Sequence, residues 1–200
     1  MKKISDCTKA EFVVQSNLIE GIKTPYSKVL ECVKGKESGD LRIDNHVEAL
    51  KFALEYSDGK SPINWIDLIT DLHETLLEGI FEPCGEFREY DVRVGVYIAP
   101  DHKNVERLMK ELGERMNLIT VNKTPSALDK IIWNVHHEFE SIHPFGDGNG
   151  RVGRLLLNLL RVQNGLPFTI VQAKQRFEYY ESIEVWRVAN WDRRRGSLHF

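Results

Sequence analysis

Apolar residues recur at intervals of three and four along most of the chain, which is the period of an amphipathic α-helix. Such faces are expected in five segments, 46–56, 62–78, 104–117, 125–142 and 151–164. Capping residues, prolines or glycines bound the segments, such as Thr124–Pro125 before one helix and Gly165 after another. The sequence therefore predicts a mainly α fold, organised as a helical bundle.

One segment has a different period. Between Asp91 and Ile98 the chain reads D-V-R-V-G-V-Y-I, in which apolar residues alternate with others, as expected of a β-strand or half of a short hairpin. A two-stranded hairpin is marginal alone, so it either packs over the helices or offers a free edge to an extended peptide. We expect a short hairpin within residues 85–99.

Length and charge limit the classes of function. A chain of 200 residues is expected to form one domain over residues 1–200, with Lys34–Asp40 as a loop within it. The net charge of −3 disfavours binding of nucleic acid through the overall field of the protein. The short run Arg193–Arg195 is therefore expected to be a solvated tail.

Cysteine usage and hydropathy indicate a cellular compartment. The three cysteines form no CxxC pair, which is typical of free thiols in a reducing environment. No apolar run approaches the length that spans a membrane, and no leader-like apolar segment follows the N-terminal lysines. We expect a soluble, cytoplasmic protein without a membrane partner.

A glycine-rich turn between two predicted helices carries the chemistry. Residues 143–154 read H-P-F-G-D-G-N-G-R-V-G-R, and a new helix is expected to begin within this run. Glycines let backbone N–H groups approach an anion closely, and the N-terminus of the following helix adds unpaired N–H groups. Arg151 and Arg154 are three residues apart, so both guanidinium groups can bind phosphate oxygens on the same side.

Two further side chains complete a predicted site for Mg²⁺ and a polyphosphate. Asp147 supplies a carboxylate oxygen, the type of ligand that Mg²⁺ prefers. His143 has an ordinary pKa near neutrality and can accept a proton from an attacking hydroxyl. Phe145 is expected to anchor the turn in the core. The chain contains neither a Walker motif nor an HExxH zinc motif, so His136 and His137 are expected to lie at the surface or to cap a helix.

This run is similar, without a mismatch, to the signature H-x-F-x-(D/E)-G-N-G-R-x-x-R of the Fic (Fido) family. Members of the family transfer AMP from ATP to a protein hydroxyl and release pyrophosphate. The resemblance implies a Fic-type helical bundle with a hairpin flap, and a catalytic helix–loop–helix over residues 125–164. It implies the following roles: His143 as general base, Asp147 on Mg²⁺, the backbone of Gly148, Asn149 and Gly150 around phosphates, Arg151 on phosphates and Arg154 on the γ-phosphate.

Two other segments extend the resemblance. Gly85-Glu86-Phe87-Arg88 and the alternating run after it resemble the G-x-(F/Y)-R motif and flap of the family. The resemblance implies that a target peptide is aligned by Val92, Arg93, Val94 and Gly95. Arg176 with Tyr179-Tyr180 resembles an R-x-x-Y-Y motif before the last helix, which implies that both tyrosines line an adenine site. Asn190 stands further from Tyr180 than the adenine-contacting Asn of the family, so we assign it no role.

The N-terminal run Ser16-Asn17-Leu18-Ile19-Glu20-Gly21 reads as a helical turn that ends at a glycine, and by itself it fits an ordinary surface helix. It also resembles the inhibitory motif (S/T)-x-x-x-E-(G/N) of the family. The resemblance implies an inhibitory helix around residues 10–21 that contains Ser16 and Glu20. Glu20 would then pair with Arg154 and compete with the γ-phosphate for its guanidinium group.

The expected function is autoinhibited transfer of AMP from Mg²⁺-ATP to a Ser, Thr or Tyr hydroxyl of a target protein or of the chain itself. Three alternatives stay open: another nucleotide donor, removal of AMP, and a nucleotide- or protein-binding module without catalysis. A kinase-type reaction is disfavoured, because the relative that phosphorylates has A-N-K-R at Gly148–Arg151. A separate antitoxin chain is unnecessary where Glu20 inhibits in cis. The target protein, the trigger and assembly with further copies of the chain are not specified by the sequence.

Overall fold

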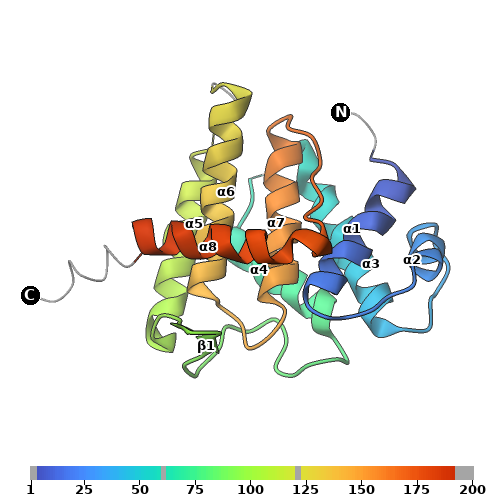
Figure 1. Cartoon of the computed structure of the whole chain (residues 1–200), viewed down its shortest axis with the longest axis horizontal. Coiled ribbons are helices and arrows are strands. Elements are labelled where there is room, and N and C mark those ends of the chain that lie inside the picture. Colours follow the sequence, from blue (N-terminus) through green and yellow to red (C-terminus); the bar gives the residue numbers. More distant parts are fainter. Residues whose placement is uncertain (1–3, 60–61, 120–122, 192–200) are drawn as a thin grey trace, which may run out of the picture.

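The computed structural model describes residues 4–59, 62–119 and 123–191 (Figure 1). This part of the chain contains α1 (Asp6–Ile19), α2 (Tyr26–Val33), α3 (Leu41–Glu55), α4 (Trp65–Leu77), α5 (Val105–Asn117), α6 (Pro125–Ile142), α7 (Asn149–Gln163) and α8 (Arg176–Asn190). Single 3-10 turns lie at Tyr56–Asp58, His102–Asn104 and Ala173–Gln175. The predicted mainly α class is confirmed. The run Arg193–Arg195 lies outside the described residues.

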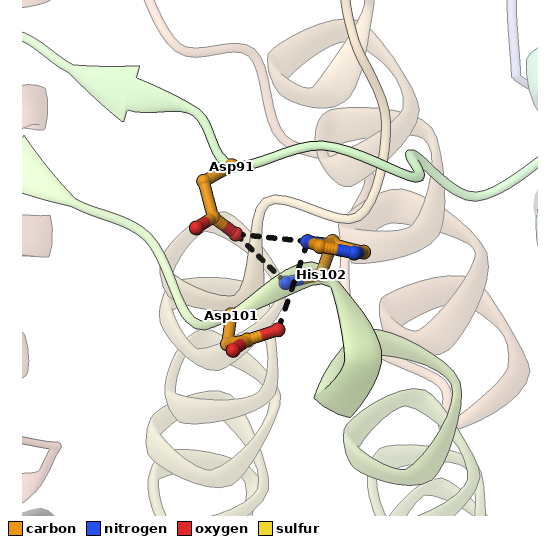
Figure 2. Close-up of side chains that lie close together, drawn as sticks. All are labelled: Asp91, Asp101 and His102. Carbon is orange, nitrogen blue, oxygen red and sulfur yellow. Dashed lines mark hydrogen bonds and ion pairs between the residues drawn. The ribbon is translucent and has the colours of Figure 1, made fainter.

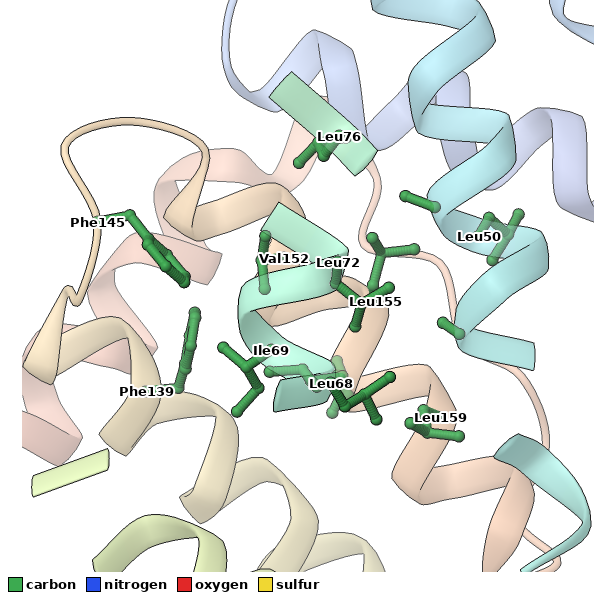
Figure 3. Close-up of a cluster of buried hydrophobic side chains, with 14 of the residues drawn as sticks. Leu50, Leu68, Ile69, Leu72, Leu76, Phe139, Phe145, Val152, Leu155 and Leu159 are labelled. Carbon is green, nitrogen blue, oxygen red and sulfur yellow. The ribbon is translucent and has the colours of Figure 1, made fainter. Parts of the chain in front are cut away.

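The helices surround α7, in which every residue from Arg151 to Val162 is buried. A helix that is buried all round occupies the centre of a bundle. Ile69 and Leu72 of α4 approach Val152 and Leu155 of α7, and Phe139 of α6 joins the same cluster (Figure 3). Figure 1 shows α8 lying across α6 and α7, with α1 to α3 grouped at one end of the molecule.

Local capping explains where the helices begin. Thr124 accepts a hydrogen bond from Ala127 N, and Pro125 opens α6, as expected from the sequence. The expected start of α3 at residue 46 is wrong, because Asp40 caps the helix through Arg42 N at 3.0 Å and α3 begins at Leu41. Likewise α4 begins at Trp65 after the cap Asn64, not at residue 62. Sequence periodicity shows a helical face but not the side chain that caps it.

The N-terminal helix is longer at its start than the expected range of 10–21. It begins at Asp6, because the Ser5 side chain accepts a hydrogen bond from Thr8 N at 3.1 Å. It ends at Ile19, and Gly21 turns the chain away with φ of +77°. Ser16 therefore lies on α1, and Glu20 is the residue directly after it.

The alternating run forms both halves of a hairpin rather than one strand. Strand β1 (Arg93–Val94) pairs antiparallel with β2 (Tyr97–Ile98), with Val94 opposite Tyr97. Gly95, with φ of +60°, reverses the chain between them. Because the turn interrupts the alternation, Val96 is 92% exposed, whereas Tyr97 is buried.

Among the described residues, no helix combines the length and the apolar character that a bilayer span requires.

Candidate active site

The turn between α6 and α7 is held in an uncommon backbone conformation. His143 ends α6 with φ of +52°, in the left-handed region that residues other than glycine rarely adopt. Its carbonyl oxygen accepts a hydrogen bond from Arg88 Nε at 2.9 Å. The buried Arg88 guanidinium also donates to the carbonyls of Tyr90 at 2.7 Å and Pro100 at 2.6 Å. Arg88 therefore joins both ends of the hairpin segment to His143, a role that its motif alone did not indicate.

Stacking of Phe145 on His73 and hydrogen bonds of the Asn149 side-chain amide hold the turn in place. Phe145 is fully buried and stacks on His73, with ring centroids 3.8 Å apart. Gly85 N donates to His73 Nδ1 at 2.9 Å, so His73 Nε2 carries the proton that faces Asp147 O at 3.1 Å. The Asn149 side chain accepts from Phe145 N and donates to Phe145 O, both at 2.9 Å. The Asn149 amide is thus used within the turn, which leaves its backbone as the part available to a ligand.

The N-terminus of α7 faces the carboxylate of Glu20. Gly148 precedes the helix with φ of +74°, and no side chain caps this end. A Cβ atom on Gly150 would collide with the Glu20 carboxylate and lie 2.9 Å from Arg154 Nη1. A larger residue at this position would therefore displace the ends of the Glu20 and Arg154 side chains from the arrangement seen here.

Arg154 is almost fully buried and makes several hydrogen bonds with the N-terminal segment. Its Nε donates to Ser16 Oγ at 2.9 Å, and its Nη2 donates to Ser16 O at 2.9 Å and to Glu20 Oε1 at 2.7 Å. Burial by itself would lower the pKa of Arg154, but the Tyr179 oxygen and the Glu20 carboxylate outweigh burial and raise it. The guanidinium group therefore stays charged inside the protein.

A cavity of about 560 Å³ opens between the hairpin, α6, α7, α8 and the end of α1. It brings together His143, Gly150 and Arg154 with Val94 and Gly95 of the hairpin. Glu20 and both Tyr179 and Tyr180 also line it. The two tyrosines lie within α8, which begins at Arg176, and not before the last helix as expected.

Some predicted site residues lie beside this cavity rather than on its wall. Asp147 is on the turn with its side chain 57% exposed, and its Oδ2 is 3.3 Å from Nη2 of the buried Arg151. Among the predicted hairpin residues, Val92 packs against the core and Arg93 is exposed. Asn190, to which no role was assigned, lines a different cavity and donates to Trp186 O at 2.8 Å.

Burial shifts the pKa values of two side chains that line the cavity, His143 and Glu140. It lowers the pKa of His143 to about 4, so the imidazole is neutral at pH 7 and can accept a proton. It raises the pKa of Glu140 to about 8, although Arg154 opposes this shift. Glu140, one helical turn before His143, was not anticipated from the sequence. The only sequence signal for Glu140 is that a charged residue stands within the apolar face of the predicted helix.

A separate cluster lies at the base of the hairpin. Figure 2 shows Asp91, before β1, beside Asp101 and His102, after β2. Asp91 Oδ1 accepts hydrogen bonds from His102 N at 3.0 Å and from His102 Nδ1 at 3.1 Å. Asp101 Oδ1 accepts from Lys103 N at 2.9 Å. These bonds close the hairpin at its base and account for the cluster, so it gives no separate indication of a metal.

Comparison with known sequences identifies the family. Residues 62–160 match the sequence model of the Fic/DOC family, and this range includes the hairpin and the complete turn between α6 and α7. The chain belongs to the Fic/DOC family. The resemblance inferred from the sequence is therefore confirmed.

Curated relatives of this Fic chain carry the name protein adenylyltransferase Fic. The relative from Nematostella vectensis is 30% identical over 184 residues, which are 86% of this chain and 42% of the relative. The relative from Drosophila melanogaster is 34% identical over 153 residues, 72% of this chain and 30% of the relative. The chain thus spans less than half the length of these two relatives.

Solved Fic structures share the fold. A Fic domain containing signaling protein from Bacteroides thetaiotaomicron has a TM-score of 0.77 at 24% identity, over 90% of this chain and 72% of that one. Fic-1 from C. elegans has a TM-score of 0.71 at 25% identity, over 92% of this chain and 56% of that one. The helical arrangement described above is therefore that of a Fic fold.

The sequence-based placement of two histidines in this Fic chain is wrong. His136 and His137 were expected at the surface or as caps, but both are buried on α6. His136 contacts Gly153 O of α7 at 3.0 Å and Tyr179 Oη of α8 at 2.9 Å. Their burial depends on α7 and α8 covering α6, which local sequence cannot indicate.

Proposed function

We propose that this chain transfers AMP from ATP to a hydroxyl group of a protein, and that residues 1–200 act as one Fic domain that includes its own inhibitory helix. The observation that carries the proposal is the cavity in which a neutral imidazole, the N-terminus of α7 and a buried arginine meet: His143, Gly150 and Arg154. These are a proton acceptor, an anion-binding helix terminus and a phosphate-binding cation.

In the proposed reaction, His143 accepts the proton of the attacking hydroxyl. The hydroxyl oxygen forms a bond to the α-phosphorus of ATP, and the bond from that phosphorus to the bridging oxygen breaks. The electron pair of the broken bond leaves with pyrophosphate. The backbone N–H groups at the start of α7 and the Arg151 guanidinium stabilise the charge of the phosphates.

The residues present fit a magnesium ion beside the phosphates. Mg²⁺ usually takes one or two carboxylates together with phosphate oxygens and waters. The Asp147 side chain is 57% exposed on the turn that precedes α7, so its carboxylate is open to an ion. When bound, the ion would neutralise part of the polyphosphate charge.

The N-terminal segment supplies the inhibition. Glu20 Oε1 accepts from Arg154 Nη2 at 2.7 Å, and Ser16 binds the same guanidinium through its side chain and its carbonyl. The N–H groups of Arg154 that donate to Ser16 and Glu20 are not available to bind a γ-phosphate. ATP would then bind with its terminal phosphate displaced, and the α-phosphorus would lie out of line with the attacking oxygen.

Removal of AMP is the second candidate. The Glu20 side chain, 31% exposed, lines the same cavity as His143. A carboxylate at this position can orient a water molecule instead of blocking a phosphate.

Intact-mass spectrometry separates these functions. The unaltered chain and the Glu20→Gly variant, in which the proposed inhibition is removed, are each incubated with Mg²⁺ and ATP, GTP, CTP or UTP, and Glu20→Gly with His143→Ala is the control. A gain of one AMP with ATP only, absent in the control, is expected. A gain of a different nucleotide would identify another donor. An unchanged mass, combined with loss of AMP from a previously modified chain, would favour the second candidate. An unchanged mass in every reaction would contradict catalysis.

A further inference from the structure

The acceptors of Arg154 come from two sides. Three of its hydrogen bonds reach Ser16 Oγ, Ser16 O and Glu20 Oε1, on or directly after α1. In the described part of the chain, its remaining hydrogen bond is from Nη1 to Tyr179 Oη at 3.4 Å, on α8. If the α1 segment releases the guanidinium group, Tyr179 is the partner that still holds it.

The direction of each hydrogen bond behind Tyr179 follows from the donors available. Gly153 O can only accept, so His136 Nδ1, at 3.0 Å, carries the proton. A neutral His136 then has an unprotonated Nε2, which accepts from the Tyr179 hydroxyl at 2.9 Å. Because the phenol proton points at His136, the oxygen lone pairs of Tyr179 are left for Arg154 Nη1.

Burial keeps the directions of these hydrogen bonds fixed. His136 is 2% exposed, and Trp133 packs edge-on against its ring with centroids 5.6 Å apart. Burial lowers the pKa of His136 well below its usual value and raises the pKa of Tyr179, so both groups keep the protonation that the hydrogen bonds require. His136 Nδ1 is bonded to the carbonyl of the residue directly before Arg154, so the network is joined to the backbone of α7.

We propose that His136 is a positioning residue which, through Tyr179, holds the Arg154 guanidinium in the orientation that binds the terminal phosphate of the nucleotide when Glu20 does not occupy it. This inference rests on the proposed function. A donor held in place before the ligand arrives loses little conformational freedom on binding. Without His136, the phenol proton of Tyr179 is no longer held away from Arg154, so a lone pair of the Tyr179 oxygen is no longer kept facing Nη1.

The test compares ATP with ADP, because only ATP carries the phosphate that Arg154 would bind. The background protein carries Ser16→Ala and Glu20→Gly, which remove the α1 side-chain acceptors, and His143→Ala, which prevents turnover. Dissociation constants for Mg²⁺-ATP and Mg²⁺-ADP are measured by calorimetry, and their ratio is the readout. A lost hydrogen bond to a charged group is expected to reduce the preference for ATP by on the order of tenfold.

Four variants in this background make the test specific. His136→Leu and Tyr179→Phe should both reduce the ATP preference. His136→Gln should retain most of it, because an amide can donate to Gly153 O and accept from Tyr179. His137→Leu is the matched control, since His137 is also buried on α6, and it should leave the ratio unchanged. An unchanged ratio in folded His136→Leu and Tyr179→Phe proteins would overturn the inference.

Nuclear magnetic resonance of the unaltered chain tests the hydrogen-bond order without nucleotide. Two-bond ¹H–¹⁵N spectra should show His136 at pH 7 with a protonated Nδ1 and an unprotonated Nε2. A protonated Nε2 would overturn the inference even if the Leu variant does not fold. If the background protein itself does not prefer ATP, the phosphate role of Arg154 in the proposed function is wrong. A preference that survives the His136 and Tyr179 variants contradicts only the further inference.

Discussion

Glu20 Oε1 lies 2.7 Å from Arg154 Nη2, although 134 residues separate the two in the chain. The Arg154 side chain is 2% exposed, whereas that of Glu20 is 31% exposed and lines the cavity. The carboxylate is therefore the accessible member of the pair. In the proposed function, a phosphate that enters the cavity would compete with this carboxylate for the same guanidinium donors.

Replacing Glu20 should activate the chain. Glu20→Gly removes the carboxylate and leaves Arg154 free to bind the γ-phosphate, so self-labelling with radiolabelled ATP should rise. A coupling of the size usual between two sites would give a gain of about 5–150-fold. Adding Arg154→Ala should bring the labelling back down, because the phosphate ligand is then lost as well.

Glu181→Gln is the matched control for this prediction, since Glu181 lines the same cavity and, within the described part of the chain, makes no hydrogen bond or ion pair with Arg154. It should leave the labelling near that of the unaltered chain. Equal labelling by the unaltered chain and Glu20→Gly, at the same ATP and Mg²⁺ concentrations, would exclude Glu20 as the inhibitor.

Replacing His143 should abolish transfer but preserve nucleotide binding. His143→Ala removes the proton acceptor, while the N-terminus of α7 and Arg151 still bind phosphates. Loss of a positioned base lowers rates by about 10²–10⁴-fold. Self-labelling of the His143→Ala, Glu20→Gly protein should therefore fall by this factor, with the dissociation constant of Mg²⁺-ATP nearly unchanged. Labelling as strong as in Glu20→Gly alone would show that another group takes the proton.

Replacing Asp147 should remove the metal dependence. Asp147→Ala should weaken binding of ATP in Mg²⁺ to the level measured in EDTA, as determined by calorimetry in the His143→Ala protein. Asp101→Asn keeps an oxygen for Lys103 N and alters the carboxylate cluster at the base of the hairpin, so it serves as the control. A loss of Mg²⁺-dependent binding in Asp101→Asn, but not in Asp147→Ala, would place the metal at that cluster instead.

The buried histidines should make the fold less stable in mild acid. Burial lowers the pKa of five of them: His46, His73, His136, His137 and His143. The unfolded chain then binds more protons than the folded one below about pH 6.5, so stability falls as the pH falls through that range. Each histidine contributes up to about 1.4 kcal/mol per pH unit. The urea midpoint should be clearly lower at pH 5.5 than at pH 7, and an equal midpoint would contradict the burial.

Glu140 should make the fold less stable as the pH rises, whereas the histidines make it less stable as the pH falls. Its pKa is raised to about 8 by burial, so the folded chain keeps a proton that the unfolded chain has lost above its ordinary pKa. This contribution to stability is therefore lost as the pH rises towards 8. Glu140→Gln cannot ionise, so its stability relative to the unaltered chain should increase between pH 5.5 and pH 8 in urea unfolding. Exposed Glu48→Gln is the control, and parallel stabilities of the Glu140→Gln and unaltered chains would contradict the shift.

Local patterns predicted several elements well and others poorly. Thr124 and Pro125 mark the start of α6 because the cap and the first helical residue are neighbours in the chain. Asp44, two residues before the expected helix start at residue 46, is of a residue type that caps helices, but its carboxylate accepts from Ser38 N at 2.9 Å while Asp40 caps α3. Several side chains near a helix start can accept the same kind of hydrogen bond, and only the three-dimensional fold selects one.

The sequence by itself determined the helical class and the chemistry of the turn at residues 143–154, because those groups are contiguous and a short segment fixes their spacing. The tertiary structure decided which distant groups meet that turn. Arg88 holds the His143 carbonyl, His136 faces Tyr179, and Glu140 is buried in the cavity wall. These contacts require α1, α8 and the hairpin to pack against α6 and α7. Periodicity shows that a helix has a buried face, but it does not specify which helix covers that face, so burial and pKa shifts follow only from the packed structure.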